Sequence, residues 1–336
     1  MLSKSLTMRL WLGLLLLMLL VGCSTSEEEK ETGQGVMFVS SRGGSSLLRF
    51  DEATLVAGDV LPKAFIRGNL TRISQPGALT YEAAPRRLYV PNGGDNSILV
   101  FENVRTLSEN VPPTRILFGL GTQLARPVHV VLDSGRDLLY VANAGTNSVQ
   151  VYPNASTIQG GVAPVRSLAG SDTKIGGISH LWLDTENDRL WVVDPISSSL
   201  LVFNSASTLN GNVPPSRIIT GSNSRLQAPQ SILLVGKRLY VACTGIILRF
   251  EDADGISGDV APTAVLFGAA TGLIRPQQMA LRADKDELYV ADSGAGAVFV
   301  FANASTANGG PAFLRRLQGQ LTNFVDITGL VLDFTP

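Results

Sequence analysis

The chain has 336 residues, 45% of them hydrophobic and 16% charged, with a formal net charge of −1. This length and composition allow a sizeable core. The net charge is close to zero, so the chain does not have the excess of basic residues that nucleic-acid binding requires. We therefore expect no nucleic-acid partner. The two cysteines are Cys23 and Cys243. Because Cys23 falls in an N-terminal leader, the globular part keeps one cysteine and cannot form an internal disulfide.

The leader has the pattern of a secretory signal. Lys4 and Arg9 accompany the apolar stretch LWLGLLLLMLLV (10–21), which is shorter than the roughly 20 residues that span a bilayer. Leu20-Val21-Gly22-Cys23 resembles the lipobox of bacterial lipoproteins, whose cysteine is lipidated on sulfur and becomes the mature N-terminus. We predict a signal peptide over 1–22 and lipidation of Cys23. An uncleaved N-terminal anchor helix is the alternative.

The next segment predicts a tether. Residues 24–35, STSEEEKETGQG, contain no large apolar side chain and cannot bury enough surface to fold. With Cys23 they form the predicted anchor and tether, 23–35, whose flexible part spans on the order of 20 Å. Ser24 follows the cysteine, and the sorting rule that accompanies the lipobox resemblance then indicates the outer membrane. The expected location is the bacterial envelope, lipid-anchored and facing the periplasm or the surface.

From residue 36 onward one pattern returns at a fixed spacing. In the third copy it consists of four strand-like runs, PVHVVLD (127–133), LLYVAN (138–143), SVQVY (148–152) and VRSLAG (165–170), with turn residues between them. No convincing amphipathic helix interrupts the repeats. Four antiparallel strands repeated at a constant period predict the blades of an all-β propeller. The aromatic residue of the second run recurs 51, 51, 51, 49 and 49 residues apart, at Phe38, Tyr89, Tyr140, Trp191, Tyr240 and Tyr289.

The two ends of the repeat region predict how the ring closes. The region opens with a second strand, VMFVS (36–40), and ends with a first strand, DITGLVLDF (326–334). We expect the C-terminal strand to pair into the N-terminal blade, which gives six blades over 36–336 and leaves no free sheet edge at the closure. A solenoid is the alternative, but it would need polar capping repeats, and neither end resembles one.

The repeat also resembles a known family. P-x-x-x-x-x-D followed by LYVAN and SVQVY is similar to the NHL-repeat propellers and the wider TolB-like six-bladed group, over essentially all of 36–336. Proteins of this group include binding scaffolds, lactonases and lyases, so the resemblance implies the fold rather than an activity. The chain departs from the NHL pattern by a longer insert before each outer strand, such as NASTIQGGVAP (154–164). We interpret the insert as an Asn-capped turn; a glycosylation sequon is the alternative.

Two sets of residues are expected at the channel face, which the fourth-to-first and second-to-third connections form. The first set, near the start of each inner strand, consists of Ala78, His129, His180, Ser231, Gln278 and Gly329. The second set, which opens each second-to-third turn, consists of Ser41, Asn92, Asn143, Asp194, Cys243 and Asp292. In the second set, hydrogen bonding to the turn backbone is the alternative role. The predicted ligand-binding residues are His129, His180, Ser231, Gln278, Asn92, Asn143, Asp194 and Asp292.

The histidines are the most informative of these residues. The chain has only two, His129 and His180, and they hold the same repeat position in adjacent blades. Sheets pack about 10 Å apart, so both rings could reach one ion or ligand, or bind channel water. Zinc takes three or four protein ligands and no third histidine exists, so we predict no metal site and no cofactor. The acidic segment EDADGISGD (251–259) has acidic residues at calcium-loop spacing, but it lacks the third ligand and the glycine placement of an EF-hand and is interpreted as a turn.

No sequence signature of a hydrolase nucleophile, metalloprotease, redox dithiol, P-loop or dinucleotide fold is present, and we assign no catalytic residue. The sequence favours a non-catalytic lipoprotein whose propeller binds an envelope protein, a peptide or a small molecule at its channel face. The alternative is a metal-dependent hydrolase or lyase, as the resemblance to lactonase-like and amidating-lyase propellers implies. Those enzymes use acidic or three-histidine metal sets at the channel. A purely structural surface protein is the third possibility.

Overall fold

A computed structural model describes residues 35–335. The predicted signal peptide, Cys23 and the tether before residue 35 lie outside the described residues. Within the described range the helices are short 3-10 turns, and none is long and apolar enough to cross a membrane. These turns are η1 (Asn69–Thr71), η2 (Val104–Thr106), η3 (Leu120–Thr122), η4 (Ser171–Thr173) and η5 (Ala269–Thr271).

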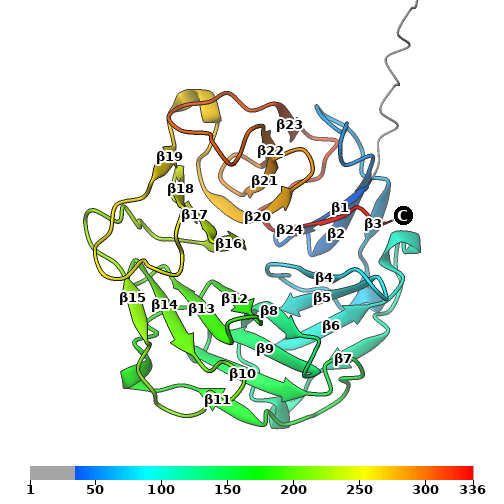
Figure 1. Ribbon diagram of the computed structural model, residues 1–336. Helices are drawn as coiled ribbons and strands as arrows, with labels where there is room; N and C mark the ends of the chain where they lie inside the picture. Colours follow the sequence, from blue (N-terminus) through cyan, green and yellow to red (C-terminus); the bar gives the residue numbers. More distant parts are fainter. Residues whose placement is uncertain (1–34, 336) are drawn as a thin grey trace, which may run out of the picture. The chain divides into compact units, whose positions relative to one another are not determined.

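Residues 35–335 form six antiparallel sheets of four strands each, arranged as a β-propeller (Figure 1). The inner strands are β4 (Thr80–Glu82), β8 (Pro127–Asp133), β12 (His180–Asp184), β16 (Ser231–Val235), β20 (Pro276–Arg282) and β24 (Ile327–Asp333). The second strands are β1 (Val36–Ser41), β5 (Arg87–Asn92), β9 (Leu138–Asn143), β13 (Arg189–Asp194), β17 (Arg238–Cys243) and β21 (Glu287–Asp292). The third strands are β2 (Ser46–Asp51), β6 (Ser97–Phe101), β10 (Ser148–Pro153), β14 (Ser199–Asn204), β18 (Ile246–Phe250) and β22 (Ala297–Phe301). The outer strands are β3 (Ala64–Ile66), β7 (Arg115–Leu117), β11 (Arg166–Leu168), β15 (Arg217–Ile219), β19 (Ala264–Leu266) and β23 (Arg315–Gln318).

The C-terminal strand closes the ring, as predicted. In Figure 1 the red β24 lies beside the blue β1, and the two strands pair antiparallel, with Asp333 opposite Val36. A second interaction links this strand to the neighbouring blade. The buried carboxylate of Asp333 forms an ion pair with Arg105 and accepts a hydrogen bond from the Tyr81 hydroxyl. The closure therefore combines a full β-ladder with a buried polar contact to the next blade.

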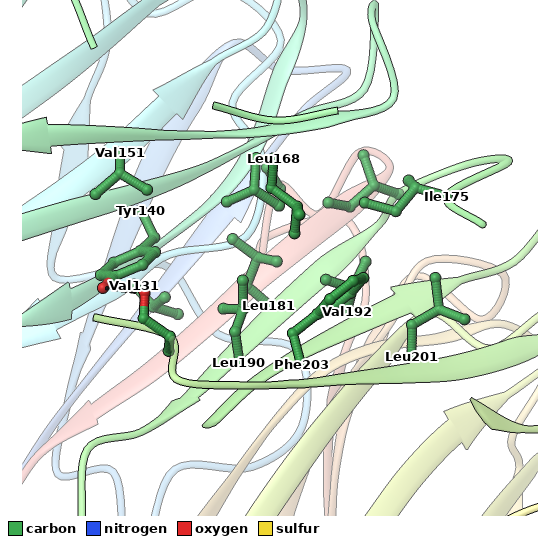
Figure 2. Close-up of a cluster of buried hydrophobic side chains, with 14 residues drawn as sticks. Val131, Tyr140, Val151, Leu168, Ile175, Leu181, Leu190, Val192, Leu201 and Phe203 are labelled. Atoms are coloured by element: carbon green, nitrogen blue, oxygen red, sulfur yellow. Dashed lines mark hydrogen bonds between the residues drawn. The ribbon is translucent and has the colours of Figure 1, made fainter. Parts of the chain in front are cut away.

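Apolar side chains pack between neighbouring blades and form the core. Figure 2 shows one such cluster, in which Val131 and Tyr140 of one blade meet Leu181 and Phe203 of the next. The repeated aromatic residue of each second strand is at most 1% exposed. All the strands of the ring lie between Val36 and Asp333. The chain from residue 24 onward thus contains the complete ring.

The inserts before the outer strands link one blade to the next. The hydroxyls of Tyr89, Tyr140 and Tyr289 each donate a 3.1 Å hydrogen bond to an alanine carbonyl in the following blade's insert. In the insert 154–164 that alanine is Ala155, and Gly160 of the same insert bridges to the outer strand of the preceding blade. The acidic segment 251–259 has the same role, because its Gly258 bridges to the preceding outer strand. These inserts therefore stabilise the ring from its rim.

Candidate functional site

Strand pairing places the first set of residues at one level around the channel. Opposite four of them stands the residue that directly precedes a second-set residue. The pairs that show this register are His129 with Ala142, His180 with Val193, Ser231 with Ala242, and Gly329 with Ser40. The shared register that the repeat period predicted is thereby confirmed at these four positions.

Polar side chains of the first set bond to backbone groups of other blades. The Gln278 Oε1 accepts hydrogen bonds from the amides of Leu79 (2.8 Å) and Leu330 (2.9 Å), and its Nε2 donates to the Leu79 carbonyl at 2.7 Å. The Ser231 hydroxyl donates to the carbonyl of Gln277. Gln278 and Ser231 therefore link inner segments of different blades inside the channel.

The two histidines stack on each other in this layer. Their ring centroids are 3.8 Å apart with an interplanar angle of 13°, and each residue is 3% exposed. Burial lowers the pKa of His129 to about 3. Burial, together with the neighbouring imidazole, lowers the pKa of His180 well below its usual value of 6.5. Both rings are therefore neutral at pH 7, and this neutrality lets two imidazoles stack without repulsion.

The hydrogen-bonding states of the two rings differ. The Nδ1 of His129 accepts a 3.1 Å hydrogen bond from the Leu181 amide, so its proton resides on Nε2, which lies 3.4 Å from the Thr80 hydroxyl oxygen. Within residues 35–335, neither ring nitrogen of His180 has a hydrogen-bond partner. Buried polar groups of this kind are nearly always partnered, so a small polar molecule could bind there.

Two cavities meet at this layer, and His180 and Gln278 line both. The first, which we name the channel mouth, has a volume of about 290 Å³ and lies above the first set. The second, the lower channel, has a volume of about 390 Å³ and is lined by residues further along the inner strands. The first set thus separates a polar cavity from a largely apolar one.

The channel mouth is lined by Ala78, His180, Ser231 and Gln278 of the first set, and also by residues that the sequence analysis missed. Six of the missed residues directly precede a first-set residue in the chain, so the lining extends one position upstream of the predicted one. They are Gly77, Val128, Ser179, Gln230, Gln277 and Thr328. The signal was available, because the last four of these are polar.

Arginine side chains give the channel mouth its charge. Arg42, from the β1–β2 turn, and Arg126, which precedes β8, line the cavity. Burial lowers the pKa of Arg42; the carboxylate of Asp326 opposes this effect, whereas the nearby Arg275 and Arg126 add to it. Asp326 pairs with both Arg42 (3.8 Å) and Arg275 (3.4 Å). Two guanidinium groups therefore share one carboxylate, and Arg126 adds a third positive charge near Arg42, which leaves an excess of positive charge at this face.

The second set is placed differently from the first. Asn92, Asn143, Asp194 and Asp292 are fully buried, and none of them lines either cavity. One side-chain oxygen of each residue accepts a hydrogen bond from the backbone of the loop that leads into its own blade's inner strand, over distances of 2.6 to 2.8 Å. Asp194 and Asp292 also accept bonds from their own turns, as the alternative interpretation expected. These residues position the mouth loops.

The remaining members of the second set, Ser41 and Cys243, do not line the cavities either. The Ser41 hydroxyl donates a 2.9 Å hydrogen bond to the carbonyl of Val325, and Cys243 is fully buried, which raises the pKa of its thiol to about 12. Among residues 35–335 there is no group of three or more histidine, cysteine or acidic side chains placed to hold a metal ion.

Comparison with solved structures agrees with the fold. A chain of a nidogen–laminin complex matches with a TM-score of 0.61 at 13% identity, covering 89% of this chain and 98% of its own. A candidate 6-phosphogluconolactonase from Bacteroides fragilis matches with a TM-score of 0.55 at 13% identity, covering 90% and 99%. Another from Bacteroides uniformis matches with a TM-score of 0.56 at 14% identity, covering 80% and 79%. At such identities the likeness establishes the propeller fold alone.

Sequence comparisons add no family. No family model matches the chain. No curated protein matches it either.

Proposed function

We propose that this protein is a lipid-anchored envelope protein whose propeller binds a small acidic ligand at the channel mouth without transforming it. The observation that carries the proposal is the pair Arg42 and Arg126, which line a cavity of about 290 Å³ above a hydrogen-bonded floor. A ligand carboxylate or phosphate there would supply negative charge to the three neighbouring guanidinium groups. Arginine binds such groups through paired, charge-assisted hydrogen bonds.

The floor of the cavity favours a small ligand over a chain that threads through the channel. The Gln278 side chain bridges Leu330 on β24 and Leu79, which precedes β4 two blades away, through three hydrogen bonds, and the stacked histidines lie in the same layer. The uncharged groups of Gln230 and Gln277 offer hydrogen bonds to hydroxyls on the same ligand. These contacts suit a polyhydroxy acid or a sugar phosphate.

The anchor belongs to the proposal because of the sequence Leu20-Val21-Gly22-Cys23. A lipid on Cys23, followed by the acidic tether 24–35, would hold the propeller near a membrane surface and leave its channel mouth accessible to solutes of the envelope. A single lipidated N-terminus fits a binding protein that works at a fixed location.

A hydrolase acting on a sugar lactone at the same mouth is the second candidate. The fold likeness to candidate 6-phosphogluconolactonases and the unpartnered nitrogens of His180 favour it. A general base works best when its pKa lies near the working pH. Because burial holds the pKa of His180 well below 6.5, this ring accepts a proton poorly at neutral pH, and we rank binding above hydrolysis.

Titration calorimetry of the chain 24–336 with 6-phosphogluconate, and with glucose as the uncharged control, tests the proposal. We expect saturable, salt-sensitive binding of the acid that weakens at least tenfold in the double variant Arg42→Gln, Arg126→Gln. Arg316→Gln, an exposed arginine on β23, is the matched control and should bind as the parent does. Equal affinity for glucose and the acid would refute the proposal. Turnover of 6-phosphogluconolactone would establish the second candidate.

A further inference from the structure

We propose that the lower channel is a second binding site, which takes a small uncharged apolar molecule with one hydroxyl group hydrogen-bonded to His180. This site lies on the opposite side of the first set from the channel mouth and does not depend on the acidic ligand proposed there. Its volume of about 390 Å³ falls in the range of small-molecule pockets.

The lining of the lower channel selects an apolar occupant. It comes from the second half of the inner strands, where the inward side chains are large and apolar. None of the described residues that line this cavity carries a formal charge at pH 7, since the two histidines are neutral. A charged ligand would lose its hydration there and meet no countercharge. The main apolar walls are Val131, Trp182, Leu233, Met279, Leu281 and Leu332.

His180 supplies the polar end of the site. Its imidazole is 3% exposed and lines the cavity, yet neither nitrogen has a partner within residues 35–335. On the neighbouring strand, the Ser231 hydroxyl donates to the Gln277 carbonyl instead. His129, in contrast, is held by the Leu181 amide.

A neutral imidazole has one N–H donor and one nitrogen acceptor. A single hydroxyl can therefore donate to or accept from His180, whereas a purely apolar ligand leaves both nitrogens unpartnered. A polar group that is buried without a partner is costly. The occupant that fits is thus an apolar ring or short chain that carries a hydroxyl.

Two probes of equal size separate these contributions. p-Cresol presents a hydroxyl, and p-xylene replaces it with a methyl group. Titration calorimetry with the chain 24–336, which contains the complete ring, should show saturable binding of p-cresol about tenfold tighter than binding of p-xylene. In His180→Phe the ring shape is kept and the nitrogens are lost, so the two probes should bind with equal affinity.

A second variant keeps the test valid if His180→Phe fails to fold. Leu332→Trp keeps an apolar side chain at a half-buried position, fills the cavity and should weaken both probes at least tenfold. Arg316→Gln, at an exposed position on β23, is the matched control and should leave p-cresol binding unchanged. The proposal is overturned if neither probe binds, because water alone would then hydrogen-bond to His180. It is equally overturned if the preference for p-cresol survives in His180→Phe or if Leu332→Trp has no effect on either probe. Binding of 6-phosphogluconate, measured in parallel, tests the channel mouth independently.

Discussion

Acidification should destabilise this protein through its two buried histidines. In the folded chain the pKa of His129 is about 3, against an ordinary value of 6.5. Between these values the unfolded chain binds a proton that the folded chain does not, so the free energy of unfolding falls as the pH falls. The stabilisation from the neutral ring is complete above pH 6.5 and is lost progressively down to about pH 3. At pH 4.5, two units below 6.5, His129 alone lowers the free energy of unfolding by about 3 kcal/mol.

His180 acts in the same direction, because burial and the stacked partner also lower its pKa. Each histidine should contribute about 1.4 kcal/mol per pH unit to the slope of stability against pH below about pH 5.5. The uncharged neighbours Thr80, Ser231 and Gln278 add no titration of their own. We therefore predict that the free energy of unfolding falls steeply on acidification and that these two imidazole rings cause the fall.

Urea unfolding of the chain 24–336 between pH 7.5 and pH 4.5 measures this slope. His129→Phe and His180→Phe should each flatten it, and the double variant should flatten it most. His129→Phe also removes the hydrogen bond from the Leu181 amide, but that loss is nearly the same at every pH and leaves the slope interpretable. The carboxylates titrate alike in all variants. Parallel curves for the parent and the double variant between pH 6 and pH 4.5 would refute the reasoning.

Three further predictions concern closure, anchoring and the loop supports. Deleting 326–336 removes β24 and leaves the first blade without its inner strand, so the cooperative thermal transition should disappear; a truncated chain that melts like the parent would argue against this closure. Cys23→Ser should abolish incorporation of a labelled fatty acid and leave an unprocessed precursor, and label retained in the variant would exclude the predicted anchor. Asp194→Ala leaves three backbone N–H groups without their acceptor and should cost about 3 kcal/mol in chemical unfolding. An exposed control, Asp95→Ala, should cost under about 1 kcal/mol, and equal losses in the two variants would contradict the supporting role.

The inner strands show why some boundaries could be predicted and others could not. The runs 127–133 and 138–143 coincide with β8 and β9, because apolar patterning and turn residues are local properties of the chain. In the second blade, β4 begins only at Thr80. The amide and carbonyl of the preceding Leu79 are both bonded to the side chain of Gln278, which is 199 residues away. No local pattern contains that interaction.

The candidate site likewise has some features that the sequence predicted and others that it did not. The period of the repeat determined that His129 and His180 share one register, and the structure adds that their rings stack and that one of them lacks a partner. The arginines of the channel mouth were not predicted. Arg42 lies in a β1–β2 turn, whereas Arg275 precedes an inner strand more than 200 residues later.

The sequence by itself determined the number of blades, the closing strand and the level of each side chain in the channel. These properties follow from the alternation of strand residues and from a constant period, both of which are readable along the chain. Only the tertiary structure decided which side chains meet across the ring. Closure brings together residues that the sequence holds far apart. Arg42, Arg126 and His180, from three different blades, then face the cavities.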